Sequence, residues 1–301
     1  MPALRIFLTG GTGFIGAAVA RALLAGGHLV TGLVRPASRP RLPSGVVPFP
    51  GDLRHPDSYR GAAAACDVVV HAAYEYDGAG REVPEGDVAA VRVMTELLAR
   101  GSCRVVYTSN AFLLDHPACV GIGEGRALPT ELVARRERLR REREICEAGG
   151  AAVRVGVVYG GRGGTMSVLL DALAAPDAAN PLEGLGNRWS LIHLEDLAAL
   201  YRAIVEREGG GIYHGVDGCP LSVGDVVALS RAALADLPAL GDGIAGAGAA
   251  TRLREYRHVL GRDIVISPER SLRLGWMPRF GSYRDGVSRA VREWHTLRAA
   301  S

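Results

Sequence analysis

The chain has 301 residues with a formal net charge of +3, and 48% of its residues are hydrophobic. This length and apolar content suit one large or two small globular domains with an ample core. The small charge gives no argument for binding to nucleic acid or to a membrane surface. No lysine occurs, so all 35 basic residues are arginine. Because a guanidinium stays protonated, the composition excludes every mechanism that needs a neutral ε-amine.

Cysteine and histidine spacing argues against a metal site. The five cysteines include no C-x-x-C pair and the eight histidines show no H-x-H or H-x-x-x-H pair, so no metal is expected. The first residues read as a strand that enters a glycine-rich turn, not as a signal peptide. No uncharged apolar run reaches about 18 residues, so we expect no membrane span and a cytoplasmic protein.

Apolar runs alternate with helical patterns through the first half of the chain. Strands are predicted at residues 4–9, 28–34, 46–49, 67–71, 104–109 and 152–158. Helices are predicted at residues 13–25, 56–64, 82–100 and 129–148. This alternation predicts the α/β class, a Rossmann-type doubly wound parallel sheet with helices on both faces.

The second half mixes short strands with helices. Strands are predicted at 189–193 and 211–214, and helices at 194–207, 222–235 and 283–296. We therefore expect the doubly wound domain to cover residues 1–160, with core elements continuing to about 215. Residues 161–301 are expected to form mainly a smaller, mostly helical substrate-binding lobe interleaved with that core. The glycine-rich stretch 241–250 is predicted to be a flexible loop, since no strand precedes its glycines.

An arginine-rich helical segment covers residues 131–147. It holds six Arg and five Glu, so its net charge is only +1. Such mixing favours a solvated, ion-paired helix face over a nucleic-acid surface. No nucleic-acid partner is expected.

A glycine-rich turn follows the first predicted strand. The segment Thr9-Gly10-Gly11-Thr12-Gly13-Phe14-Ile15-Gly16 has the spacing G-x-x-G-x-x-G between a strand and a helix. In this context the first glycine permits a tight turn, the second lets a pyrophosphate approach the backbone, and the third allows close helix packing. The candidate cofactor residues here are Gly10, Thr12, Gly13, Phe14, Ile15 and Gly16.

This turn resembles the fingerprint of the extended short-chain dehydrogenase/reductases, the epimerase, dehydratase and ketoreductase group. Further segments are similar to motifs of that family: Gly51-Asp52-Leu53, His71-Ala72-Ala73, Arg154 with Val158-Tyr159-Gly160, and Ile192-His193-Leu194-Glu195-Asp196. The resemblance covers nearly the whole chain and implies an NAD(P) cofactor. It also implies that Asp52, Leu53, His71, Ala72 and Ala73 line the cofactor.

The end of the second strand indicates which cofactor binds. NAD enzymes place an acid there to hold the ribose 2′-hydroxyl. Here the strand ends Leu33-Val34-Arg35-Pro36, without a carboxylate. Arg35 can fork onto a 2′-phosphate, so we predict NADP(H).

The catalytic residues depart from the family pattern of Ser/Thr, Tyr and Lys. The segment Thr108-Ser109-Asn110-Ala111 resembles the family's T-S-S-A, with Asn110 at the catalytic position and Ser109 pointing the other way. No tyrosine occurs between Tyr107 and Tyr159. Ala134 and Arg138 are aligned with the Tyr and Lys. All three members of the triad are therefore missing.

Three functions remain open. The first is an NADPH-dependent ketoreductase in which Asn110 orients the carbonyl and the substrate supplies its own proton. The second is a redox-neutral cyclase, dehydratase or isomerase on the same scaffold, and the third is a non-catalytic NADP-sensing protein. An extended reductase sequence without this triad resembles the atypical ketoreductases that tailor aromatic polyketide antibiotics such as angucyclinones.

The substrate is then expected to be a small aromatic, polycyclic molecule. Since ligands of doubly wound folds bind at the carboxyl ends of the strands, residues after those ends are candidates. The candidate substrate-binding residues are Tyr74, Tyr76, Phe112, Tyr159, Met166 and Trp189. The oligomeric state is left open by the sequence.

Overall fold

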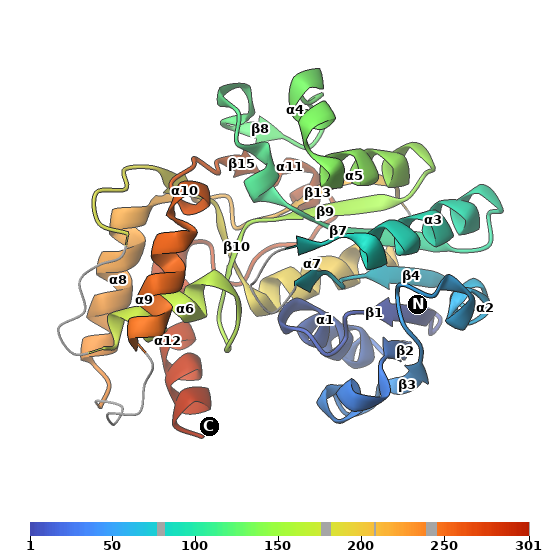
Figure 1. Ribbon diagram of the computed structural model, residues 1–301, viewed down its shortest axis with the longest axis horizontal. Coiled ribbons are helices and arrows are strands. Elements are labelled where there is room, and N and C mark those ends of the chain that lie inside the picture. Colours follow the sequence, from blue (N-terminus) through green and yellow to red (C-terminus); the bar gives the residue numbers. More distant parts are fainter. Residues whose placement is uncertain (77–81, 176–181, 208, 239–245, 301) are drawn as a thin grey trace.

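A seven-stranded parallel sheet forms the centre of the molecule in the computed structural model, which describes residues 1–76, 82–175, 182–207, 209–238 and 246–300. The strand order is β13-β9-β7-β4-β1-β2-β3 (Figure 1). The strands are β1 (Arg5–Thr9), β2 (Leu29–Val34), β3 (Val47–Pro50), β4 (Val68–His71), β7 (Arg104–Asn110), β9 (Ala151–Val155) and β13 (Gly211–Gly215). The predicted Rossmann-type doubly wound α/β class is confirmed.

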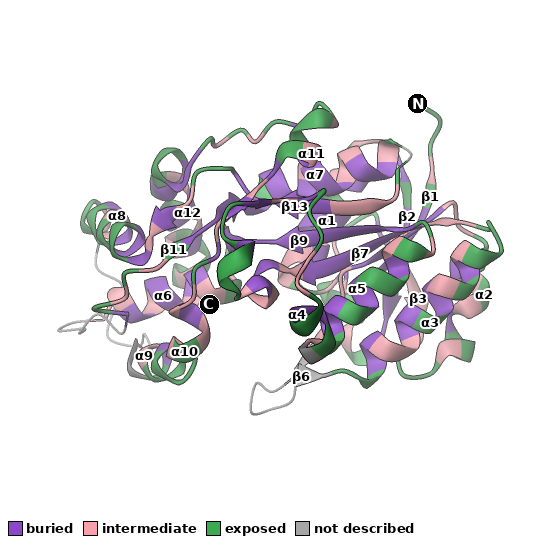
Figure 2. Ribbon diagram, turned by 90° about the horizontal axis from the view of Figure 1, so that it is seen from above, coloured by how far each residue is buried: buried purple, intermediate pink, exposed green. Residues whose placement is uncertain are grey.

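Both faces of this sheet are apolar, as a sheet covered on both sides requires. Side chains alternate along each strand: Ile6 and Leu8 join one buried cluster, while Phe7 between them joins the other. Helices α1 (Phe14–Ala25) and α7 (Leu194–Glu206) cover the first face. Figure 2 shows buried strands between helices whose outer faces are exposed.

The second face is covered by three helices. These are α2 (Arg60–Ala64), α3 (Glu85–Ala99) and α5 (Glu137–Glu147). The carboxyl ends of β1, β4 and β7 therefore open between two helical layers, where a ligand of a doubly wound sheet binds.

A second lobe, on the left of Figure 1, is built mainly from helices around its own apolar core. Its helices are α6 (Gly164–Leu173), α8 (Val223–Ala235), α9 (Gly246–Glu255), α10 (Arg257–Leu260) and α12 (Tyr283–Ala299). Short strand pairs connect the lobe and the loops: β5 (Glu75–Tyr76) with β6 (Glu82–Val83), β8 (Ile122–Gly123) with β15 (Ile266–Ser267), β10 (Val157–Tyr159) with β12 (Leu191–His193), and β11 (Arg188–Trp189) with β14 (Leu221–Ser222).

The remaining elements are short. They are the 3₁₀ turns η1 (Pro36–Arg41), η2 (Pro56–Ser58), η3 (Ala111–Leu114) and η4 (Pro117–Cys119), and the helices α4 (Thr130–Arg135) and α11 (Glu269–Arg273).

The structure corrects several predicted elements. The strand predicted over 152–158 is divided between β9 and β10, because residues 157–159 leave the main sheet and pair with β12. The single helix predicted over 129–148 is two helices, α4 and α5, because Arg136 is extended at φ −119° and ψ 96°. The strand predicted over 189–193 is divided between β11 and β12. Of the predicted loop 241–250, residues 241–245 lie outside the described part, and the rest begins helix α9.

Candidate functional site

The glycine turn between β1 and α1 is packed so tightly that two of its glycines admit no side chain. Gly10 has φ +76°, and a Cβ there would lie 2.6 Å from the backbone of Ala72 and Ala73. A Cβ on Gly16 would lie 2.1 Å from the Gly10 carbonyl oxygen. The turn therefore rests directly on the segment after β4, and the third glycine packs against the turn itself rather than against the sheet.

Gly13 differs because it faces open space. It is exposed and caps α1, and a Cβ there would meet only the Gly10 carbonyl oxygen, at 3.3 Å. No side chain caps the helix, and no acidic residue stands in its first turn. The first backbone N–H groups of α1 thus face a space that a Cβ would begin to fill, which fits a pyrophosphate held at a helix N-terminus.

A cleft of about 180 Å³ lies beside this turn, at the carboxyl ends of the strands. It is lined by Thr9, Gly10, Thr12, Gly13, Leu33, Val34, Arg35, Ser38, Gly51, Asp52, Leu53, Ala72, Ala73, Tyr74 and Glu75. Most of the predicted cofactor residues therefore meet in one place. Phe14, Ile15, Gly16 and His71 lie outside the lining.

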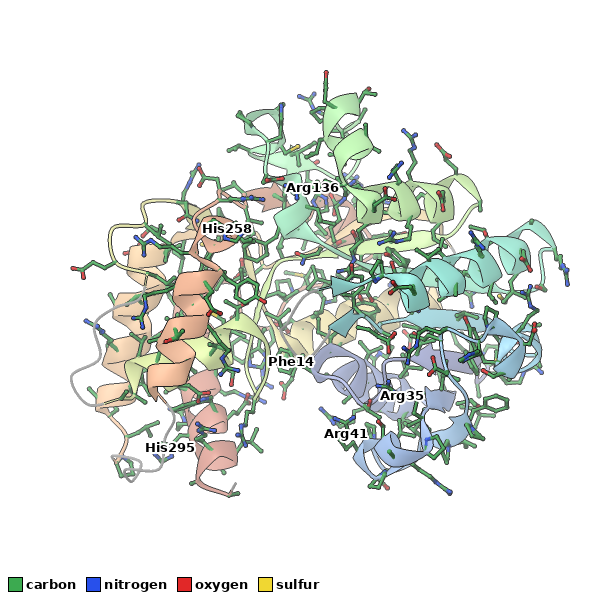
Figure 3. The ribbon with its side chains drawn as sticks, viewed as in Figure 1. Phe14, Arg35, Arg41, Arg136, His258 and His295 are labelled. Atoms are coloured by element: carbon green, nitrogen blue, oxygen red, sulfur yellow. The ribbon has the colours of Figure 1, made fainter. Side chains whose placement is uncertain are left out.

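Phe14 packs next to the turn, in the middle of the molecule between the sheet layer and the lobe (Figure 3). The Phe14 ring packs against the loop that follows β10, because a Cβ on Gly163 in that loop would lie 2.5 Å from the ring. Phe14 therefore joins the turn to the second lobe.

A larger hollow of about 780 Å³ lies between α1, α7 and α12. It is lined by Ala18, Ala22 and His193 among others, and by no residue of the glycine turn. Because the hollow lies apart from the glycine turn, the smaller cleft is the candidate cofactor site.

Charged side chains line the far end of the cofactor cleft. Arg35 is half exposed, and its Nη1 lies 3.5 Å from Glu75 Oε1. Arg54 is paired with Asp52, and the backbone N–H of Arg54 lowers the pKa of Asp52. The residues at the end of β2 include no carboxylate, so the sequence there does not reveal a partner for Arg35. Glu75 arrives from β5, and no local pattern connects the two residues.

His71 is buried beneath the cleft and takes part in a hydrogen-bond network. Its Nδ1 lies 2.8 Å from Thr9 Oγ1, and its Nε2 lies 3.1 Å from Asp87 Oδ1. Tyr107 donates to Asp87 Oδ2 at 3.2 Å, and Arg141 Nε lies 2.5 Å from the same oxygen. Burial opposes ionisation of Asp87, but the hydrogen bond from His71 and the neighbouring positive charges outweigh it, so the pKa of Asp87 is lowered.

The predicted catalytic residues stand at the end of β7. Asn110 Oδ1 accepts a hydrogen bond from the backbone of Phe112 at 2.9 Å, which leaves the amide group as the donor that can face a ligand. Ser109 is 2% exposed, and its Oγ has no hydrogen-bond partner among the described residues. Thr108 points to the opposite face, where its Oγ1 lies 2.6 Å from the Tyr201 hydroxyl. Alternation along the strand thus places Ser109 and Thr108 on opposite faces of the sheet.

Arg138 reaches the same strand end from α5. It is 8% exposed, its Nη2 donates to the Thr108 carbonyl at 3.0 Å, and its guanidinium lies 3.8 Å from the centroid of the Tyr74 ring. Ala134 is exposed in α4, beyond the break at Arg136. Arg136 and Arg262 both pair with Asp115, which holds the chain at that break. Arg138 therefore occupies a place beside the cleft, and Ala134 does not.

The predicted substrate residues are divided. Tyr74 lines the cleft, and Phe112 is half-buried against the lobe core. Three others are corrected: Tyr159, Met166 and Trp189 are at most 2% exposed and belong to that core. Their position after strand ends did not reveal this burial, which leaves no surface for a ligand. The side chain of Tyr76 lies outside the described part.

Two further features concern only the part of the chain that the structure describes. There, no group of three His, Cys, Asp or Glu side chains is arranged to hold a metal ion. None of the described helices is both long and apolar enough to span a membrane.

Comparison with known proteins agrees with this geometry. Residues 10–136 match the family model described as NAD(P)H-binding. The 3-diazoavenalumate denitrifying reductase of Streptomyces sp is 29% identical over 315 residues, covering 95% of this chain and 100% of that protein. An uncharacterised protein of Schizosaccharomyces pombe is 29% identical over 232 residues, covering 72% of this chain and 77% of that protein.

Solved structures share the fold. The UDP-glucose 4-epimerase of Thermus thermophilus, in complex with NAD, superposes with a TM-score of 0.68 at 18% identity, covering 97% of this chain and 99% of that one. Together these findings show the Rossmann-type fold and a similarity to NAD(P)H-binding proteins over residues 10–136. They support a nicotinamide cofactor.

Proposed function

We propose that this protein is an NADPH-dependent ketoreductase that reduces a carbonyl of an aromatic, polyketide-like small molecule, with the proton supplied by the substrate itself. The observation that carries this proposal is the arrangement around the end of β7. Asn110 stands at the position aligned with the usual Ser/Thr, and Arg138, aligned with the usual lysine, reaches the strand end. The dinucleotide turn beside them is complete.

The cofactor half of the proposal rests on two groups. The N–H groups at the start of α1 receive the pyrophosphate in front of Gly13, where the backbone is open. Arg35 stands at the cleft with its guanidinium half exposed, in reach of a 2′-phosphate. A dihydronicotinamide held by these groups would supply the hydride for reduction of a substrate carbonyl.

Neither Asn110 nor Arg138, two of the polar side chains described at the end of β7, is a proton source. Arg138 cannot donate one, because a guanidinium keeps its proton at any physiological pH. Asn110 can donate a hydrogen bond to the carbonyl oxygen and so orient it, but it holds no acidic proton. A phenol adjacent to the ketone solves this problem: its O–H proton passes to the new alkoxide, and solvent reprotonates the phenolate.

The test compares an aromatic ketone that carries a neighbouring hydroxyl with its methyl ether. We expect NADPH oxidation to slow sharply with the ether, while ketone binding, measured by competition, stays nearly the same. Unchanged turnover of the ether indicates an acid in the protein. No NADPH oxidation with either ketone favours a redox-neutral reaction or a sensor.

A variant pair locates any hidden acid. Asn110→Ala and Tyr74→Phe are expected to slow turnover through lost alignment, with Asn110→Ala the slower of the two. A positioned general acid typically contributes about 10²–10⁴-fold, so a loss in that range for Tyr74→Phe identifies its hydroxyl as the proton donor and contradicts the proposal.

A second candidate is reductive removal of a diazo group. It is favoured by the relative named as a denitrifying reductase, which aligns with nearly the whole chain. Hydride addition to an arenediazonium ion gives the arene and dinitrogen, and this balance requires no proton, which agrees with a site lacking the usual acid. Incubation with NADPH and a diazotised aminocinnamate, compared with an enzyme-free control, should then release dinitrogen at the rate of NADPH oxidation. Ketone reduction without dinitrogen release selects the first candidate.

A further inference from the structure

Glu75 stands among the cations of the cofactor cleft. Its Oε1 lies 3.5 Å from Arg35 Nη1, and its Oε2 lies 3.9 Å from Arg54 Nε. The Glu75 side chain is 21% exposed, whereas Arg35 and Arg54 are 55% and 47% exposed. The carboxylate is therefore the most buried member of this group.

The neighbouring backbone holds Glu75 at this place. Glu75 pairs with Val83 in the short β5–β6 ladder, just before α3 begins. A Cβ on Gly86 would lie 2.8 Å from Glu75 Oε2, so a glycine in the first turn of α3 allows the carboxylate to come this close. The positive end of the helix dipole stabilises a negative group there.

One oxygen of Glu75 has unused hydrogen-bonding capacity. Oε2 is buried and accepts no hydrogen bond from any described residue. A buried carboxylate oxygen that accepts no hydrogen bond costs free energy unless another group satisfies it. The backbone therefore fixes the position of Glu75, while Oε2 is left without a hydrogen bond within the described part of the chain.

The consequence concerns the 2′-phosphate of the cofactor. To bind that phosphate, Arg35 must share or leave its pairing with Glu75, and the phosphate then stands near a fixed negative charge. A ribose 2′-hydroxyl meets no such repulsion.

We propose that Glu75 is a specificity-determining residue that opposes Arg35: it restrains this arginine and reduces the preference for NADP(H) that Arg35 alone would give. The proposal rests on the proposed function, in which Arg35 receives the 2′-phosphate. By this account the coenzyme preference depends on two residues 40 positions apart, not on the end of β2 alone.

The experiment measures binding of NADP⁺ and NAD⁺ to the full-length protein by calorimetry. Glu75→Gln keeps the shape of the side chain and removes its charge. We expect NADP⁺ to bind about tenfold more tightly to this variant and NAD⁺ to change by less than about twofold, since only the 2′-phosphate meets the charge. In an Arg35→Met background the gain for NADP⁺ should largely disappear, because the two residues act on each other.

Asp52→Asn is the matched control. Asp52 is a second carboxylate of the cleft, but its partner is Arg54. Its neutralisation should alter NADP⁺ and NAD⁺ binding alike. Glu75→Ala provides a second neutral variant, and thermal melting confirms that each variant is folded.

The outcomes separate the two proposals. If Glu75→Gln shifts both nucleotides equally, or if the gain for NADP⁺ persists without Arg35, the role of Glu75 is contradicted. If Arg35→Met weakens NADP⁺ but neither neutral variant at Glu75 strengthens it, this inference fails while the NADPH assignment stands. If Arg35→Met leaves NADP⁺ binding unchanged, both the NADPH assignment and this inference fail.

Discussion

At the scale of single residues, identical amino acids serve different purposes within one turn. Gly10 and Gly16 are required by contacts of 2.6 Å and 2.1 Å that a Cβ would make with backbone atoms. Gly13 makes no such contact, so its absent side chain serves the ligand rather than the fold. Substitutions at Gly13 and at Gly16 should therefore have different effects: the first on nucleotide binding and the second on stability.

Gly13→Val should abolish NADP⁺ binding, with a loss of more than about 100-fold in calorimetry, because the valine methyl groups occupy the space in front of α1. The melting temperature should change little, since Gly13 already has an extended backbone with φ −88° and ψ 172°. Gly16→Ala is the contrasting variant and should lower stability directly. Undiminished NADP⁺ binding by Gly13→Val would mean that the pyrophosphate lies elsewhere.

Asp217 provides a pH-dependent prediction in the second lobe. It is 8% exposed, and burial, together with the carboxylates of Asp196 and Asp285, raises the pKa of Asp217 to about 7. Between the unfolded value of 3.8 and about 7 the folded protein therefore keeps a proton that the unfolded chain loses. Stability must fall as the pH rises through this window.

Asp217→Asn removes this ionisation. A shift of this size corresponds to at most about 4 kcal/mol, and the new amide gains no assured partner, so we expect a net gain of about 1–2 kcal/mol at pH 8 and little at pH 4. Urea unfolding at the two pH values measures it. Equal pH dependence in the two proteins would exclude Asp217 as its source.

At the scale of elements, the arginine-rich segment shows what amphipathic patterning misses. The sequence predicts one helix with a solvated, ion-paired face. The structure breaks it at Arg136, and Arg138 and Arg141 turn inward at 8% and 6% exposure. The predicted exposed ion pairs occur in pairs such as Arg143 with Glu147. A period of 3.6 residues identifies a face but does not reveal a buried carboxylate on a neighbouring helix.

Asp87 joins α3, α5, β4 and β7 through its contacts with Arg141, His71 and Tyr107. Asp87→Asn leaves Arg141 with an uncompensated buried charge, so we expect a loss of about 3 kcal/mol in the free energy of unfolding at neutral pH. Because the pKa of Asp87 is lowered in the folded protein, its stabilisation is present above the unfolded value of 3.8 and is lost as the pH falls below it.

Chemical denaturation at pH 7 and pH 3 measures both effects. The difference between the wild type and Asp87→Asn should shrink at pH 3. Arg140→Met is the matched control, since Arg140 pairs with Glu137 on the exposed side of the same helix and should cost less than about 1 kcal/mol. A loss for Asp87→Asn as small as that of the control would show that the network is not stabilising.

At the scale of the whole molecule, the sheet could be predicted because its signals are local. Doubly buried strands are continuous apolar runs, and the glycine turn is a contiguous motif. The cleft could be predicted only in part, since its lining comes from several strand ends. The pairing of Arg35 with Glu75 and that of Asp115 with Arg262 join segments far apart in the chain. The burial of Trp189, whose Nε1 donates to the Leu260 carbonyl, likewise depends on a later helix.

The glycine turn is also easier to predict from the sequence than the substrate-binding residues are. The turn is made by residues 9–16 and rests on residues 72–73. The lobe packs its aromatic residues into its own core, so position after a strand end does not distinguish a ligand contact from a core residue. Tyr74 and Asn110 remain the side chains that we propose to face a substrate.

The most direct test of the central claim is the fate of the hydride. The protein is incubated with NADPH deuterated at the transferable C4 position and an aromatic ketone bearing a neighbouring hydroxyl, and the product is analysed by mass spectrometry. The account predicts one deuterium on the carbinol carbon of each product molecule, with one NADPH consumed. A product formed without deuterium and without NADPH consumption would contradict it and identify a redox-neutral enzyme.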